Sequence, residues 1–190
     1  MSSTIALFVQ HPRCSVQSVN GVIKALGQNY NYKVFTKHEV EDDYFDAVDC
    51  VCFPGGVGDS DTYDVLFKHH EHSIRRYVQN GGHFFGICMG AYWAGSRYFD
   101  ILSGLDAVQY IKRPTTEIKR SYGTVAEIEW LGQKEKMFFY DGCTYTGDGE
   151  CDIVARYANG EPMAIIQGNI GIIGCHPESE EFRYEKPVTK

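Results

Sequence analysis

Residues Gly81–Trp93 read GGHFFGICMGAYW. Their mostly apolar middle, residues 83–88, is typical of a buried strand, and the residues from Met89 onward favour a helix. Cys88 stands at the junction, with one glycine two positions before it and another two positions after it. A strand that turns directly into a helix belongs to an α/β sheet, and the spacing raises the question of whether Cys88 packs or reacts.

Upstream of this stretch, strands and helices alternate. The pattern predicts strands at 5–9, 32–36 and 48–53, and helices at 16–26 and 62–79. Ser15 is placed to cap the first helix and Gly27 to end it, while Ser60 or Asp61 is expected to cap the second. Alternating strands and helices indicate three layers, with a doubly wound and mainly parallel sheet.

Downstream of about residue 107 the pattern changes. Residues 124–130 alternate between apolar and charged side chains, and further strands are predicted at 137–140, 152–158, 163–167 and 170–174. We interpret these as antiparallel strands added at one edge of the sheet. The segment 141–150 (DGCTYTGDGE) is expected to be a polar loop. No repeat or linker interrupts the sequence, so residues 1–190 are predicted to form one domain.

The composition narrows the class of protein. The chain has 190 residues, of which 43% are hydrophobic and 23% charged, and its formal net charge is −7. An acidic chain without a basic cluster argues against nucleic acid as a partner. The longest early apolar run is too short for a signal sequence or a membrane span. Seven cysteines without a CxxC pair are typical of reduced thiols, so we expect a soluble cytoplasmic protein.

Gly86-Ile87-Cys88-Met89-Gly90 fits the pattern Gly-x-nucleophile-x-Gly. Such a turn lifts the nucleophile clear of the sheet, and the helix that begins behind it favours the thiolate, the reactive form of cysteine. The alternative is a buried cysteine between two packing glycines. The pentapeptide alone leaves both interpretations open.

Two other strand ends carry groups that complement a nucleophile. His176 and Glu178 follow the last strand, and residues two apart in extended chain point the same way, so the carboxylate can orient the imidazole. Gly55 and Gly56 follow the third strand, where side-chain-free backbone can turn amides toward an oxyanion, with the Met89 amide as second donor. Taken singly, both motifs can be plain turns. Together they predict acyl transfer through a thioester.

In this order and spacing, Phe53-Pro-Gly-Gly56, Gly86-Ile-Cys-Met-Gly90 and His176-Pro-Glu178 resemble the class I glutamine amidotransferase-like superfamily. Within it, Tyr63, the helix end Tyr77–Gly82 and the run to Tyr92 are most similar to the N-terminal domain of eukaryotic-type biotin protein ligases and its stand-alone relatives. The resemblance implies a flavodoxin-like fold. It also implies that Cys88 is the nucleophile, His176 the base and Glu178 its orienting carboxylate, with oxyanion-hole amides from Gly56 and Met89.

The chain departs from that family pattern in two respects. Amidotransferases that release ammonia from glutamine usually carry a glutamine four residues after the nucleophile, where this chain has Tyr92. Nothing in the sequence resembles a biotin ligase catalytic domain, so ligase activity is not predicted.

Other residues near the strand ends are weaker candidates for substrate binding. Arg13 follows the first strand and could pair with a substrate carboxylate, although an exposed loop arginine is equally plausible. Gly55 and Tyr92 are further candidates, and of Tyr92 and Trp93 one could form a pocket wall while the other packs in the core. The cluster His69–His72 matches no strong ligand spacing and is interpreted as a solvated helix face. We predict no metal site and no cofactor.

The sequence therefore supports two hypotheses. In the first, the protein is a cysteine-dependent amidohydrolase that acts on a small-molecule amide, and a separate protein accepts any ammonia that is used. In the second, the fold is a non-catalytic ligand-binding or regulatory module in which Cys88 is a ligand contact or a redox sensor.

Overall fold

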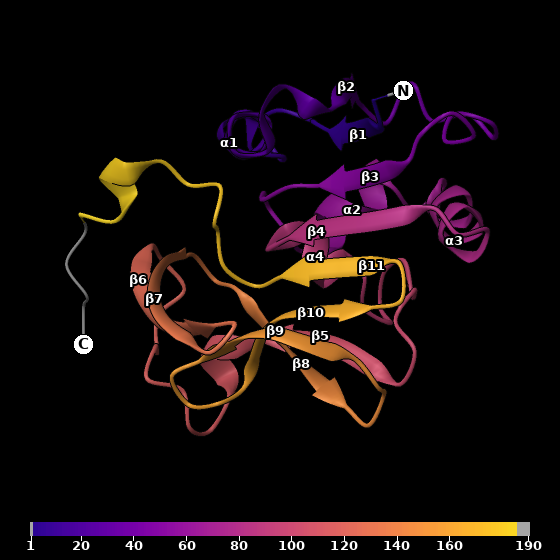
Figure 1. The fold of residues 1–190 in the computed structure, drawn as a ribbon. Helices are drawn as coiled ribbons and strands as arrows, with labels where there is room; N and C mark the ends of the chain where they lie inside the picture. Colours follow the sequence, from indigo (N-terminus) through magenta and orange to yellow (C-terminus); the bar gives the residue numbers. More distant parts are fainter. Residues whose placement is uncertain (1, 186–190) are drawn as a thin grey trace.

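The computed structural model describes residues 2–185, which are built around a nine-stranded mixed sheet. Five neighbouring strands run parallel in the order β2-β1-β3-β4-β11 (Figure 1). Their bounds are Thr4–Phe8 for β1, Asn31–Phe35 for β2, Cys50–Phe53 for β3, His83–Ile87 for β4 and Ile170–Ile173 for β11. Because parallel strands end at the same edge, the residues that follow β1, β3, β4 and β11 lie close together.

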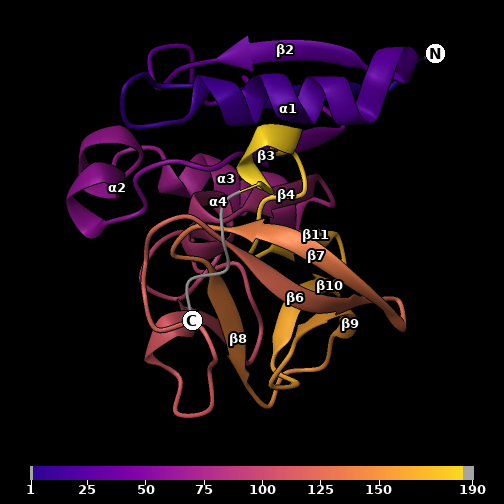
Figure 2. The ribbon, with the colours of Figure 1, turned by 90° about the vertical axis from the view of Figure 1, so that its left-hand side faces the viewer.

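The second half of the chain extends the sheet with antiparallel strands, as predicted. After β11 come β10 (Pro162–Gln167), β9 (Asp152–Tyr157), β6 (Thr124–Trp130) and β7 (Gln133–Phe139). The β6–β7 hairpin turns at Leu131 and Gly132, which both have positive φ, and Figure 2 shows its strong twist. β7 begins four residues earlier than predicted, because its first residues are polar and exposed while only its last three are buried.

Helices cover both faces of the parallel strands. The helix α1 (Val16–Leu26) packs on one face, where Val19 and Val22 join Leu7 and Ile87. The helices α2 (Ser60–Leu66), α3 (Glu71–Gln79) and α4 (Met89–Trp93) pack on the other face. Short 3₁₀ helices lie at Gly27–Asn29 (η1), Tyr110–Lys112 (η2) and Glu181–Arg183 (η3). The result is the predicted flavodoxin-like arrangement of three layers.

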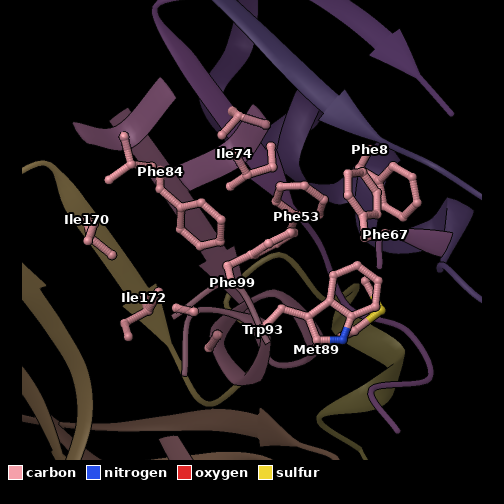
Figure 3. Close-up of a cluster of buried hydrophobic side chains, with 14 of the residues drawn as sticks. Phe8, Phe53, Phe67, Ile74, Phe84, Met89, Trp93, Phe99, Ile170 and Ile172 are labelled. Carbon is pink, nitrogen blue, oxygen red and sulfur yellow. The ribbon is translucent and has the colours of Figure 1, made fainter. Parts of the chain in front are cut away.

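Alternation along the strands decides which side chains face which layer. Successive side chains of a strand point to opposite faces of the sheet. Leu7 therefore faces α1, while Phe8 faces the helices on the other side. On that second face, Phe8, Phe53, Phe67, Trp93 and Phe99 form an aromatic cluster with ring centroids 4.9–6.1 Å apart for most pairs (Figure 3). Trp93 is fully buried there, so of Tyr92 and Trp93 it is the one that packs in the core.

The ends of α1 confirm the sequence analysis. The Ser15 side chain accepts a hydrogen bond from the Ser18 amide at 3.1 Å, and Gly27 follows the helix with φ of 71°. For α2 the predicted caps were wrong. The Asp59 carboxylate accepts a hydrogen bond from the amide of Thr62 at 2.7 Å, so the helix begins at Ser60, two residues before the predicted start.

A single helix over 62–79 was also predicted, and the structure contains two. Helix α2 ends at Leu66, and α3 begins at Glu71 after a turn over 67–70. Phe67 leaves helical geometry (φ −131°) while its ring is fully buried against Phe8 and Phe53. The two histidines that follow are poor helix formers, so packing of Phe67 outweighs helix continuation.

The prediction of a polar loop over 141–150 was wrong as well. Residues Cys143–Gly147 form β8, which pairs with β5 (Leu105–Gln109) in a separate two-stranded antiparallel sheet. Cys143, Thr144 and Tyr145 are buried. Threonine and tyrosine favour strands, and the surrounding glycines and aspartates masked that preference.

Candidate active site

Cys88 lies at the turn between β4 and α4, in a strained backbone conformation. Its φ is 48° and its ψ is −96°, and its amide donates to the Ile173 carbonyl at 2.8 Å. A Cβ on Gly86 would lie 2.5 Å from the Gly90 oxygen, and one on Gly90 would lie 1.9 Å from the Phe53 oxygen. The two glycines are therefore required for the close approach of β3, β4 and α4, and the strain is concentrated at the thiol-bearing residue.

The Cys88 thiol is 6% exposed and lines a cavity of about 500 Å³. Its Sγ lies 3.4 Å from the Tyr140 carbonyl, to which the thiol donates. The remaining walls come from residues within 11–18, 55–57, 138–140 and 176–183. Three of these segments follow β1, β3 and β11, and the fourth spans the end of β7, so the cavity occupies the carboxyl-end edge of the sheet that the sequence predicted.

His176 and Glu178 line the same cavity, beyond the end of β11. The His176 amide donates to the Phe138 carbonyl at 2.8 Å, which holds the segment against β7. The His176 Nδ1 and Glu178 Oε1 atoms are 2.8 Å apart, and their side chains are 12% and 3% exposed. Glu178 Oε1 also accepts the hydroxyl of Ser18 at 2.6 Å. The predicted pair is thus formed and buried, with Nδ1–H directed at the carboxylate.

The surroundings of this pair favour its charged form. Burial works against the imidazolium, yet the charge of a Cys88 thiolate, a hydrogen bond with it and the bond to Glu178 raise the pKa of His176 to about 10. Burial also opposes ionisation of Glu178, but the hydrogen bonds from His176 and Ser18 and the His176 charge lower its pKa. A cationic imidazole that shares a cavity with a cysteine favours the thiolate form of that cysteine.

The loop Pro54-Gly55-Gly56 is held against the residues that precede α1. The Ser15 amide donates to the Gly55 carbonyl at 2.8 Å, and the Val57 amide donates to the Arg13 carbonyl at 2.7 Å. A Cβ on Gly56 would lie 2.5 Å from that Arg13 oxygen and 2.7 Å from Met89 Sδ. Within residues 2–185, the amides of Gly56 and Met89 donate to no other protein group, so both are available to a ligand.

The three tentative substrate-binding residues have different positions. Gly55 and Arg13 line the cavity, and one guanidinium nitrogen of Arg13 donates to the Thr62 hydroxyl at 3.1 Å. Tyr92 lies beside the cavity rather than among its lining residues. Its hydroxyl is 3.0 Å from the carbonyl oxygens of Asp141 and Gly142, so it supports the turn that presents the Tyr140 carbonyl to Cys88.

Ser18 and Tyr140 are contacts that sequence reasoning missed. Each lies far along the chain from the residue it meets, since Ser18 bonds Glu178 across 160 positions and Tyr140 meets Cys88 across 52. Ser18 is also an ordinary residue for the first turn of a capped helix, so no local signal marks it.

Other kinds of site find no support in the part of the chain that the structure describes. No group of three or more histidine, cysteine, aspartate or glutamate side chains there could hold a metal ion. None of the helices there has the length and hydrophobicity needed to traverse a bilayer.

The lowered pKa of Glu178 predicts a pH effect on stability. Its contribution is complete above the ordinary glutamate pKa of 4.5 and is lost as the pH falls through the lower value of the folded state. We therefore expect the difference in unfolding free energy between the wild type and Glu178→Gln to shrink on acidification, measured by urea denaturation from about pH 6 to about pH 3. The contributions of the other carboxylates to the unfolding free energy are the same in both proteins, so they cancel in that difference. A difference that is independent of pH would contradict the assigned charge state of Glu178.

Solved structures share this fold. It is shared with a glutamine amidotransferase that is 19% identical, with a TM-score of 0.69 over 92% of this chain and 90% of that one. PurLQS from Thermotoga maritima is 14% identical, with a TM-score of 0.69 over 96% and 92%. A glutamine amidotransferase from Thermotoga maritima is 12% identical, with a TM-score of 0.68 over 96% and 79%. The chain therefore has the glutamine amidotransferase-like fold.

The chain belongs to the family described as "Biotin-protein ligase, N terminal", whose sequence pattern matches residues 7–103. The matched segment contains Cys88, Met89 and the Gly55-Gly56 loop, whereas His176 and Glu178 lie beyond it. The resemblance inferred from the sequence is confirmed. No curated protein sequence matches this chain.

Proposed function

We propose that this protein is a cysteine-dependent amidohydrolase of the glutamine amidotransferase type, with Cys88, His176 and Glu178 as its catalytic triad. The observation that carries the proposal is the buried His176–Glu178 pair at 2.8 Å, which shares one cavity with Cys88 and has an imidazole pKa raised to about 10. A pure binding module has no physical need of an oriented imidazolium beside a strained cysteine.

The reaction follows from these positions. The Cys88 sulfur attacks the carbon of a carboxamide, forming a C–S bond, while the amides of Gly56 and Met89 stabilise the oxyanion. The imidazolium of His176 gives its proton to the departing nitrogen, and the C–N bond breaks to release ammonia or an amine. Water then attacks the thioester, His176 accepts its proton, and the C–S bond breaks to release a carboxylic acid and return the sulfur.

The substrate in this proposal is a small amide. Arg13 and Gly55 line the cavity, so the guanidinium is available to an anionic group of the substrate and the glycine leaves room for it. Tyr92 acts indirectly, through the turn that it supports. If the ammonia is used, a separate acceptor protein receives it. The described residues contain only free cysteines, as expected for a protein of the reducing cytoplasm.

The direct test is ammonia release from a panel of primary carboxamides, including glutamine and asparagine, by the wild type and by Cys88→Ala. We expect turnover of at least one carboxamide by the wild type, a thioester adduct at Cys88 in the intact mass, and neither in Cys88→Ala. Cys50→Ala, which removes a half-buried thiol outside the cavity, is the control and should remain active. Ammonia release that persists in Cys88→Ala would refute the mechanism.

A further inference from the structure

We propose that Ser18 is a positioning residue, whose hydroxyl joins the carboxylate of the triad to the loop that carries the Gly56 amide. This inference rests on the proposed function and assigns a role to α1. Ser18 is 6% exposed in the first turn of that helix. Its Oγ is 2.6 Å from Glu178 Oε1 and 3.0 Å from the Gly55 amide nitrogen.

The hydrogen bonds that join Gly55, Ser18 and Glu178 can be assigned donors and acceptors in only one way. A backbone N–H group can only donate, so the Gly55 N–H donates a hydrogen bond to Ser18 Oγ. The single hydroxyl proton of Ser18 is then left for Glu178 Oε1, and the short distance is typical of a bond to a charged acceptor. Oε1 accepts a second hydrogen bond, from His176 Nδ1. One oxygen thus receives two hydrogen bonds, and both favour the ionised form of Glu178.

Further contacts show that α1 packs against both the Glu178 segment and the Gly55-Gly56 loop. A Cβ on Gly21 would lie 2.2 Å from the Glu178 carbonyl oxygen, so the helix backbone and the Glu178 backbone are in close contact. At the start of the same helix, the Ser15 amide holds the Gly55 carbonyl. A Cβ on Gly55 would lie 2.6 Å from His176 Cε1, so the loop and the imidazole are packed together as well. Ser18 is the side chain that connects these contacts.

If Ser18 has this role, Ser18→Ala should change the pH dependence of Cys88 alkylation and should not unfold the protein. Alanine is a better helix former than serine, so Ser18→Ala should fold. Without the hydroxyl, the buried carboxylate loses one of its two donors and protonates more readily. The acid limb of Cys88 alkylation by iodoacetamide should move to higher pH, with a rate roughly tenfold below the wild type near pH 5 and within about twofold of it near pH 8.

Three further proteins sharpen this experiment. Ser18→Thr keeps the hydroxyl and should restore the wild-type profile. Ser73→Ala removes a serine of α3 that is equally buried, at 3% exposed, and should leave the profile unchanged. In a Glu178→Gln background, Ser18→Ala should have no further effect on the acid limb, because the group on which it acts is gone. A Ser18→Ala profile equal to the wild type, or a shift that persists in that background, would overturn the inference.

A second readout separates this inference from the proposed function. The Glu178 carboxyl can be titrated by ¹³C NMR in labelled protein, and its midpoint should rise in Ser18→Ala whether or not Cys88 is reactive. If the wild-type midpoint and the variant midpoint coincide, Ser18 does not stabilise the ionised form of Glu178, and the inference is wrong. If the midpoint rises but Cys88 is unreactive in the wild type, the positioning of Glu178 by Ser18 stands and the amidohydrolase proposal fails.

Discussion

Replacing His176 with alanine should slow alkylation of Cys88 by iodoacetamide about a hundredfold near pH 7. The thiolate is the reactive form, and the neighbouring imidazolium is the positive charge that stabilises it in this buried site. Two contacts fix the position of His176. Its Nδ1 lies 2.8 Å from the Glu178 carboxylate, and its backbone amide donates a hydrogen bond to the Phe138 carbonyl. Loss of the imidazole removes the cation that Glu178 holds in this cavity.

The measurement is favoured by the state of the other thiols. Burial raises the pKa of Cys14 and Cys50 to about 12 and raises those of Cys52, Cys143, Cys151 and Cys175 as well. In the wild type, peptide mapping should therefore find the label first at Cys88. His72→Ala is the matched control, since that histidine lies on α3 and is exposed. Equal rates in His176→Ala and the wild type would favour the ligand-binding module over the enzyme.

Replacing Gly90 with alanine should destabilise the protein by at least about 3 kcal/mol. The added methyl carbon would lie 1.9 Å from the Phe53 carbonyl oxygen and 2.7 Å from its carbonyl carbon. These are backbone atoms of a central strand, so neither can rotate away as a side chain would. Either α4 moves from β3, which opens the aromatic cluster of Figure 3, or the turn at Cys88 is rebuilt.

Urea denaturation of Gly90→Ala and Gly132→Ala separates this steric effect from the ordinary cost of replacing a glycine. Gly132 lies at the tip of the β6–β7 hairpin with φ of 82°, and a Cβ there would meet no atom within 4 Å. Its substitution should cost only about 1 kcal/mol, from backbone strain. If both variants lose the same free energy, the close contact between α4 and β3 is not a constraint on the fold.

Periodic features of the sequence predicted their structures well. The strands β1, β3, β4 and β11 are short apolar runs, and α1 has both its cap and its terminating glycine in the expected places. These elements depend on local preferences and on burial of a regular face, which the order of residues records directly. The helix break at Phe67 and the strand β8 were missed because packing outweighed local propensity in the first case and surrounding turn residues concealed it in the second.

The candidate site divides in the same way. The glycines around Cys88, the spacing of His176 and Glu178 and the Gly55-Gly56 loop are short-range patterns, and they indicate which groups meet once the strand ends are brought together. The contacts that orient those groups come from elsewhere in the chain. Ser18 reaches Glu178 and Gly55, and Tyr140 reaches Cys88, because the sheet topology places β1, β3, β7 and β11 around one cavity. The spacing of residues in the sequence indicates the local geometry of a turn, but only the packed sheet sets the distances between residues that are far apart in the chain.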